Sequence, residues 1–169
     1  MSISKKRALT AGVMVATAMA VTFTACKKDD DNPPAARTTS YDLKGVGADA
    51  AKVNGVVTLT ENTDSSINLI LKLNKTTKDA QQAIYLIGGT AATPTTDTLY
   101  VNTTADIKGT GAAMTVNIFK NVKTIKANTA AGQKDVAFRY ADVLAYAAHM
   151  KVLTGEKKDT LAIGVVGKK

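Results

Sequence analysis

Few residues of the chain have side chains that commonly perform catalysis or bind metals. The sequence contains one cysteine, Cys26, and one histidine, His149. A zinc site needs several Cys or His ligands, and a catalytic triad needs a nucleophilic serine in a sharp turn, whereas Ser65 and Ser66 lie in a polar segment typical of an ordinary reversal. This inventory predicts no metal and no cofactor, and it indicates that His149, beside Met150, is a packing residue.

Carboxylates leave one route to catalysis. A glycosidase needs two carboxylic acids flanking the bond that it cleaves, and Asp97 with Asp106, or Asp135 with Asp142, could meet in space. Nothing in the spacing selects a pair, and surface aspartates in turns explain all four. The sequence therefore predicts a protein that is not an enzyme.

Aromatic side chains leave a route to carbohydrate binding, because a sugar ring stacks on a flat side chain. The chain has no Trp, and its five Tyr are spread along the sequence. Tyr85 and Tyr100 could share a face beside a loop over residues 88–97, although strand tyrosines are more often half-buried packing residues. Carbohydrate binding or a carbohydrate-active accessory role therefore stays open as an alternative.

The N-terminal segment has the layout of an export signal. Lys5, Lys6 and Arg7 precede an uncharged run over residues 8–25, which is at the lower limit of length for a permanent membrane span. We expect residues 1–25 to be removed. Cys26, which follows directly, has no second cysteine to pair with.

The end of this run, residues 21–26 (Val-Thr-Phe-Thr-Ala-Cys), resembles the lipobox of bacterial lipoproteins. The resemblance implies that Cys26 becomes the lipidated first residue and that the protein's partner is a membrane, reached through the lipid anchor. Stable anchoring takes more than one acyl chain, and bacterial lipoproteins typically carry two or three. Phe23 departs from the pattern, since the family usually has a smaller aliphatic residue there.

Residues 26–39 form a polar stretch with two prolines, which predicts a flexible tether. Directly after Cys26, the residues Lys27, Lys28, Asp29 and Asp30 resemble the lipoprotein export signal of Bacteroidota-type bacteria. That resemblance implies an outer-membrane, lipid-anchored protein facing the cell exterior; a periplasm-facing anchor is the alternative.

The charge pattern argues against nucleic acid as a partner. The whole chain has a formal charge of +8, and removing residues 1–25 takes away three basic residues and no acidic ones. The remaining lysines are scattered among Asp, Asn and Thr rather than clustered with aromatic residues on one face, as a nucleic-acid interface requires. Solvated surface charge explains them better.

From Tyr41 onward, short apolar alternations separated by turn residues predict an all-β body. About 130 residues suffice for one domain, which we place at residues 40–169 and expect to be a single antiparallel β-sandwich. The expected strands cover residues 53–60, 67–73, 83–87, 98–103 and 114–122, with a hairpin turn over 61–66.

The C-terminal third has a mixed pattern. An Ala-rich segment predicts a short helix over residues 140–147, followed by a strand over 149–153. Residues 156–163 favour a second short helix. Residues 164–167 would then form a closing edge strand, with Lys168 and Lys169 protecting it from pairing with another chain.

Four segments of this body resemble the CHRD domain found in secreted and lipid-anchored bacterial proteins: residues 43–45, 53–59, 68–74 and, closest to Bacteroidota members, 136–146. The resemblance implies a β-sandwich with Greek-key-like antiparallel pairing and a non-catalytic role. The family usually carries an Ala-His-Ile-His segment, but the corresponding residues 83–89 contain no histidine, so nothing that depends on those histidines carries over.

Two Asp-Thr-Leu tripeptides resemble the site at which Bacteroidota O-glycosylate exported proteins, and they imply possible modification of Thr98 and Thr160. Together the sequence predicts a lipid-anchored, surface-exposed binding or adhesion protein whose ligand is an unknown protein or glycan. A structural envelope protein that only packs with its neighbours is a further alternative.

Overall fold

Alternation of apolar and polar side chains produces an almost entirely β structure. The computed structural model describes residues 36–102, 107–155 and 158–168, all within one compact unit, Pro33–Lys169. The strands in these residues are β1 (Thr38–Lys44), β2 (Val53–Glu61), β3 (Ile67–Leu73), β4 (Gln82–Gly89), β5 (Pro94–Asn102), β6 (Met114–Val122), β7 (Thr124–Thr129), β8 (Gly132–Ala137), β9 (Ala147–Thr154) and β10 (Asp159–Gly167). The helices are the short 3-10 turn η1 (Gly47–Asp49) and α1 (Tyr140–Ala145).

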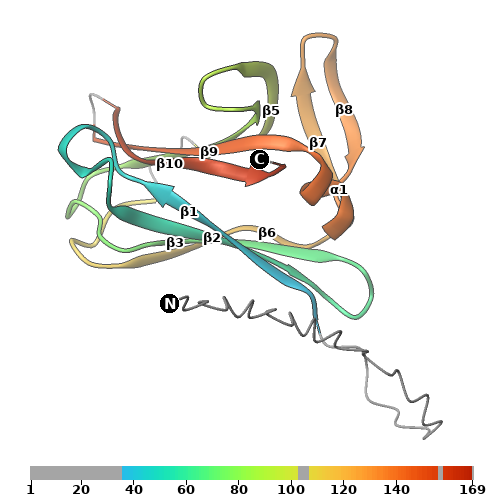
Figure 1. The fold of residues 1–169 in the computed structure, drawn as a ribbon, viewed down its shortest axis with the longest axis horizontal. Coiled ribbons are helices and arrows are strands. Elements are labelled where there is room, and N and C mark those ends of the chain that lie inside the picture. The colour runs from blue at the N-terminus through green and yellow to red at the C-terminus, as the bar shows by residue number, and fades with distance from the viewer. Residues whose placement is uncertain (1–35, 103–106, 156–157, 169) are drawn as a thin grey trace, which may run out of the picture. The chain divides into compact units, whose positions relative to one another are not determined.

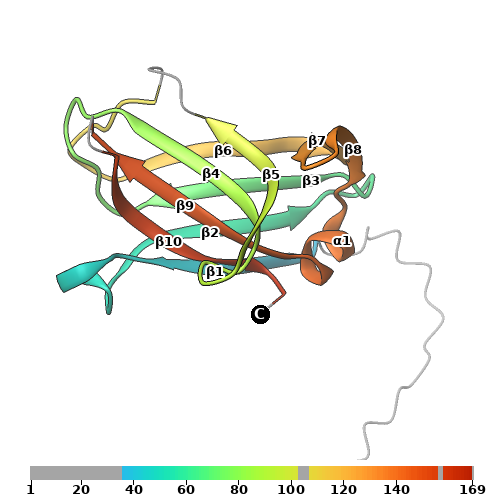
Figure 2. The same ribbon diagram turned by 90° about the horizontal axis from the view of Figure 1, so that it is seen from above.

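The described strands form one antiparallel sheet of ten, in the order β6-β3-β2-β1-β10-β9-β4-β5-β7-β8. The sheet curls, so that β6, β3, β2 and β1 form one layer and β10, β9, β4 and β5 form the other (Figures 1 and 2). The layers join where β1 meets β10, at the pair Lys44 and Ile163. The prediction of a single all-β antiparallel domain is confirmed, and its two layers belong to one continuous sheet.

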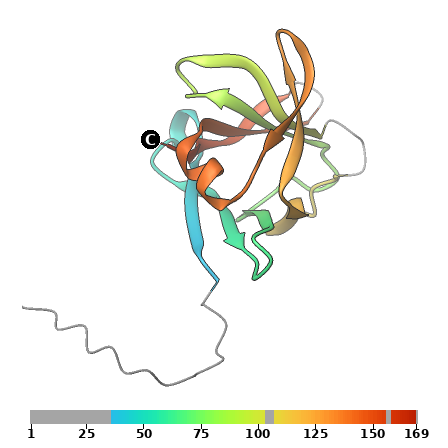
Figure 3. The same ribbon diagram turned by 90° about the vertical axis from the view of Figure 1, so that its right-hand side faces the viewer.

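β6 and β7 follow each other as two segments of one bent strand, which returns the chain from the first layer to the second. Met114–Val122 pairs with β3, whereas Thr124–Thr129 pairs with β5 and β8, and only Lys123 separates the two segments. Asn121, just before the bend, has a positive φ of 53°, which Asn tolerates better than most residues. In Figure 3 this strand runs along one side of the domain and ends in the projecting β7–β8 hairpin.

The inner faces of the two layers meet in one hydrophobic core. Alternate residues of β2 and β3 contribute side chains with no exposed surface, among them Leu59 and Leu71, and the opposite layer contributes Leu86, Met150 and Val152. Each such side chain stabilises the fold by roughly 1.5–3 kcal/mol through its burial. The core is therefore the product of the two-residue period predicted for the strands.

An aromatic cluster fills the side of the domain where β5 and the bent strand diverge. The Phe119 ring packs edge-on against Tyr100, with centroids 5.5 Å apart, and against Phe138, with centroids 5.1 Å apart. Edge-to-face pairs of this kind add roughly 0.5–1.5 kcal/mol beyond burial alone. The cluster joins β5 and β6 where no ladder of hydrogen bonds does so in the described residues.

The predicted helix over 140–147 is confirmed as α1, and the strand over 149–153 as β9. The predicted helix over 156–163 is wrong, because residues 159–167 form β10. The segment 164–167 is not an edge strand either, since β10 pairs with β9 on one side and β1 on the other. The hairpin ladder with β9, together with one pair to the distant strand β1, overrides the local preference of an Ala-containing segment.

Two further differences concern turns and boundaries. Gly88 and Gly89 belong to β4, and β5 begins at Pro94, so most of the predicted loop over 88–97 is strand. β7 and β8 have no counterpart among the predicted strands. β1 begins at Thr38, two residues before the predicted start of the domain.

Contacts at the start of β1 fix where the chain enters the sheet. The Arg37 guanidinium forms an ion pair with Glu61 and lies 4.7 Å from the centre of the Tyr140 ring. The Tyr140 hydroxyl lies 2.6 Å from Oγ1 of Thr39. The hydrogen bond from Arg37 lowers the pKa of Glu61. These contacts bring the first described residues to the end of the domain that carries α1.

The close approach of β1 to β10 generates a stability prediction. A Cβ added at Gly164 would lie 2.3 Å from the carbonyl oxygen of Asp42 and 2.8 Å from Cδ2 of Leu43. We expect Gly164→Ala to lower the free energy of unfolding by about 1–3 kcal/mol, the usual range for overpacking, as measured by chemical denaturation. Lys44→Ala, an exposed position on the same seam, should change it by less than about 0.5 kcal/mol. Equal stability of Gly164→Ala and the unchanged chain would contradict this packing.

Candidate functional site

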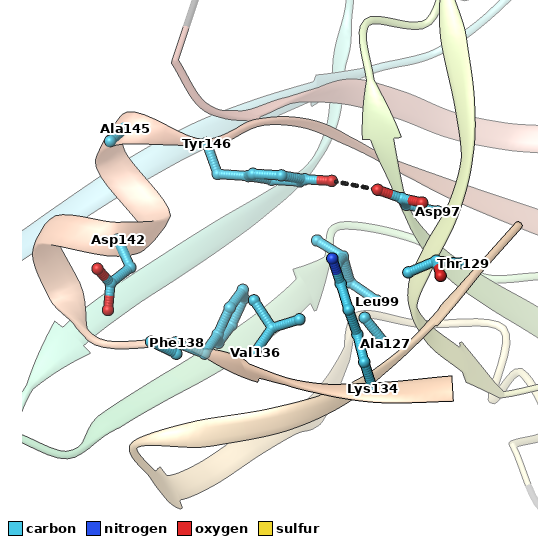
Figure 4. A pocket seen from close by; sticks show the side chains of 11 residues that line it. Asp97, Leu99, Ala127, Thr129, Lys134, Val136, Phe138, Asp142, Ala145 and Tyr146 are labelled. Carbon is cyan, nitrogen blue, oxygen red and sulfur yellow. Dashed lines mark hydrogen bonds between the residues drawn. The ribbon is translucent and has the colours of Figure 1, made fainter. Parts of the chain in front are cut away.

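A pocket of about 260 Å³ opens at the end of the domain that carries α1, and we call it the end pocket (Figure 4). It lies between β5, the β7–β8 hairpin and α1. Its lining residues are Asp97, Leu99, Ala127, Thr129, Lys134, Val136, Ala137, Phe138, Asp142, Ala145 and Tyr146. Pockets that enclose drug-sized ligands are about 300–1,000 Å³, so the end pocket suits a single ring or a small group.

Apolar side chains form the inner part of the end pocket. Leu99, Ala127 and Phe138 are buried, and Val136 is partly buried. Phe138 is held in place by its edge-on contact with Phe119, and Ala127 faces inward from β7 because alternate residues of that strand turn toward the core. The wall therefore offers a packed apolar surface to a ligand.

Tyr146 and Asp97 bridge the opposite side of the pocket. The Tyr146 hydroxyl donates a hydrogen bond to Oδ2 of Asp97, at 3.1 Å (Figure 4). Burial of the ring, followed by the hydrogen bond and the negative charge of Asp97, raises the pKa of Tyr146. Gly88 makes room for this pair, since a Cβ there would lie 2.6 Å from the Tyr146 oxygen.

Asp142 and Lys134 are two further charged residues in the lining of the pocket. The carboxylate of Asp142 accepts a hydrogen bond from the backbone N–H of Arg139, at 3.0 Å, and so caps α1. Lys134 is exposed on β8, and its side chain extends toward the Tyr146–Asp97 pair in Figure 4. Lys134 forms no ion pair with any described residue, so its amine is available to a ligand.

The lining of the end pocket offers several groups that can hold a ligand. One ammonium can donate hydrogen bonds, two carboxylates can accept them, and an aromatic ring and an apolar wall can pack against a flat ligand. No group of His, Cys, Asp and Glu in the described ranges could hold a metal ion. The lining has no Ser, Cys or His side chain that could serve as a nucleophile with a base beside it.

Tyr85 and Tyr100 do not share a face of the sheet. Leu86, which is buried in the core, pairs directly with Tyr100, whereas Tyr85 pairs with Val101, which is 46% exposed. Directly paired residues of an antiparallel ladder project to the same side. Tyr100 therefore packs inward and Tyr85 outward, and the predicted stacking platform is wrong.

The other residues considered for catalysis either lie apart from one another or make structural contacts. His149 is buried, with Nδ1 2.9 Å from the carbonyl oxygen of Gly89, which agrees with the predicted packing role. Asp135 lies on the outer face of the hairpin, where it pairs with Lys126 at 3.1 Å, and not with Asp142. Asp106 lies outside the described residues.

Some of the residues predicted to be modified or to direct export lie in the described ranges, and others do not. Thr98 lies in β5 and Thr160 in β10, both with half-buried side chains; their glycosylation stays a prediction. Cys26, Lys27, Lys28, Asp29 and Asp30 lie outside the described ranges, as does the lipobox. Within those ranges no helix is long and apolar enough to cross a membrane.

Comparisons of the chain with protein-family models, with curated proteins and with solved structures give no match.

The sequence identifies Asp97 and Asp142 as possible acids; the predicted partner of Asp142, Asp135, lies elsewhere, and that of Asp97 lies outside the described residues. Sequence reasoning missed Lys134, Val136, Phe138 and Tyr146 as pocket residues. The only local signal was the β7–β8 hairpin, in which Ile125, Ala127 and Val136 alternate weakly with polar residues. Tyr146 and Asp97 are 49 residues apart, so no local pattern joins them.

The Tyr146–Asp97 hydrogen bond predicts an altered tyrosine titration. Tyr146 should ionise above the usual tyrosine pKa of about 10, and Asp97→Asn should lower its pKa only in part, because burial is the larger cause. Ultraviolet titration against Tyr146→Phe isolates this group. Because the folded-state pKa is the higher one, the contribution of this group to stability is present below about pH 10 and is lost as the pH rises through the folded-state pKa. An unchanged Tyr146 pKa in Asp97→Asn would contradict the interaction.

Proposed function

We propose that this chain is a lipid-anchored cell-envelope protein whose β domain binds a ligand, without catalysis, in the end pocket. The observation that carries the proposal is the pocket itself, in which the Tyr146–Asp97 pair and the Lys134 amine face an apolar wall. Sites for small ligands have this composition, with apolar surface for affinity and a few polar groups for orientation. The first candidate ligand is a group of another envelope protein.

The anchor follows from the N-terminal sequence. In this proposal Cys26 carries the lipid, Lys27, Lys28, Asp29 and Asp30 direct the protein to the outer face of the outer membrane, and the fold is that of a CHRD-like lipoprotein. An extended chain from Cys26 to Arg37 spans at most about 40 Å. Because Arg37 contacts Tyr140 of α1, this tether would join the domain at the end that carries the end pocket.

Carbohydrate binding is the second candidate, and one observation favours it. The Tyr146 ring lines the pocket, and two carboxylates and an ammonium belong to the same lining. A pyranose ring presents an apolar face to an aromatic ring and hydroxyl groups to charged partners, so it matches this arrangement.

Pocket variants test the binding proposal. The full chain in mild detergent, applied to a glycan array and to envelope proteins, should bind a ligand whose affinity falls about tenfold or more in Lys134→Ala and in Tyr146→Ala, since each removes a contact worth about 1.4 kcal/mol or more. Lys134 is exposed, so that variant should fold normally. Tyr85→Ala, on the outer face, is the matched control and should bind as the unchanged chain does.

Binding that survives both pocket substitutions but is lost in Tyr85→Ala would move the site to the outer face and contradict the proposal. The same holds for a chain that binds neither glycans nor envelope proteins. Denaturation curves of each variant separate lost binding from lost folding.

The anchor is tested in cells. The unchanged chain should fractionate with membranes and show the mass of a chain that begins at a lipidated Cys26, whereas Cys26→Ser should leave it unlipidated. Protease added to intact cells should degrade the protein if it faces the exterior. An unlipidated wild-type mass would refute the anchor; protection from protease until lysis would refute surface exposure alone.

A further inference from the structure

β8 (Gly132–Ala137) ends the described sheet and has a neighbour on one side only. It pairs with β7 in six consecutive residue pairs, from Thr124 with Ala137 to Thr129 with Gly132, without a bulge. No described strand pairs with its other edge. The hairpin projects from the rest of the sheet, so this edge faces solvent (Figures 1 and 3).

The register identifies which backbone groups are free. Only two residues separate Thr129 from Gly132, so these two form a hydrogen-bonded pair that closes the hairpin. Hydrogen-bonded and non-hydrogen-bonded pairs alternate along an antiparallel ladder. Lys134 and Val136 therefore bond to β7, whereas the N–H and C=O groups of Gln133, Asp135 and Ala137 point away from it.

The other terminal strand, β6, is a poorer edge. Its ladder with β3 shifts register twice, and Asn121 has a φ of 53°. A strand with such irregularities is twisted and cannot present an even row of donors and acceptors. Of the two terminal strands of the described sheet, β8 thus has the more regular free edge.

This edge adjoins the end pocket. Lys134, Val136 and Ala137 line the pocket, while the Asp135 side chain turns to the other face and pairs with Lys126. In a strand added beside β8, every second side chain would project on the same face as Lys134 and Val136, into the mouth of the pocket. Backbone pairing and a side-chain pocket would then act together.

We propose that the ligand of this domain is an extended peptide segment of a partner protein, which adds a strand to the free edge of β8 and places one apolar side chain in the end pocket. The proposal rests on the proposed function, because it uses the same pocket. The occupant follows from what complements each part: an extended backbone matches the alternating N–H and C=O groups along an edge, and a pocket of about 260 Å³ holds one side chain.

Charged side chains of the β7–β8 hairpin favour pairing with a particular peptide over association between copies of the domain. Lys134 and Asp135 lie on opposite faces of β8, and charged side chains on an edge strand oppose indiscriminate association between copies. A partner peptide with an acidic residue beside its apolar anchor would pair with the free amine of Lys134. We therefore expect the partner peptide to carry apolar and acidic residues at alternate positions, on the face toward the pocket. The positions between them should accept many residue types.

Selection from a phage-displayed library of random linear peptides tests the proposal, with the full chain in mild detergent as bait. Enriched peptides should bind at least tenfold more weakly to Asp135→Pro and to Gln133→Pro, because proline removes an outward N–H without removing a bond to β7. Asp135→Thr is the matched control: it also loses the ion pair with Lys126 but keeps the N–H, and it should bind normally. Circular dichroism and denaturation confirm that each proline variant is folded.

Three outcomes would overturn edge pairing. No peptide is enriched, or enriched peptides bind both proline variants normally, or the chain dimerises through β8 and excludes peptide. Glycan binding that is lost in Lys134→Ala but kept in both proline variants would refute the peptide and leave the proposed function standing. Loss of all binding in the unchanged chain would refute both.

Discussion

One sheet has to cover its own inner face, and the bent strand at Lys123 makes this possible. Leucines and isoleucines of β2 and β3 need an opposing layer, and the chain supplies it by curling the sheet until β9, β4 and β10 lie across from them. The bend sends β6 to the end of one layer and β7 to the other. Without it, the Tyr100, Phe119 and Phe138 cluster would have no place to form.

The end pocket is a by-product of this closure. β7 leaves β6 and pairs with β5, so the β7–β8 hairpin extends past the core, and the chain must return through α1 to begin β9. The space between hairpin, helix and β5 is only partly filled. Tyr146, the first residue after α1, spans it and bonds to Asp97, and Gly88 keeps the space open. The candidate site thus lies where the sheet does not close completely.

The sequence predicted best where a strand is buried on one face. Residues 53–60, 67–73 and 114–122 alternate clearly, and each is a strand in the structure. It predicted poorly where pairing with other strands decides: β10 contains an Ala and Leu pair suggestive of a helix, yet its ladder with β9 and its pair with β1 hold it extended. β8, Gly-Gln-Lys-Asp-Val-Ala, has almost no apolar period because it is mostly exposed.

The candidate site was less predictable than the fold. Asp97 and Asp142 were visible as carboxylates, but which side chains they meet depends on how β5, α1 and the hairpin pack. The prediction that Tyr85 and Tyr100 share a face was wrong by one residue of register, since adjacent residues of a strand point to opposite sides. Cys26 differs in kind, because its predicted role depends on neighbouring residues alone.

Hydrogen–deuterium exchange of the full chain, with and without its tightest-binding glycan or peptide, tests the central claim that recognition occurs at the end pocket. We expect slowed exchange to be concentrated in residues 127–146, which include β8 and α1, and in β5 around Asp97 and Leu99, with little change elsewhere. Protection confined to β4 and β9 on the outer face around Tyr85, with exchange in β8 and α1 unchanged, would contradict it.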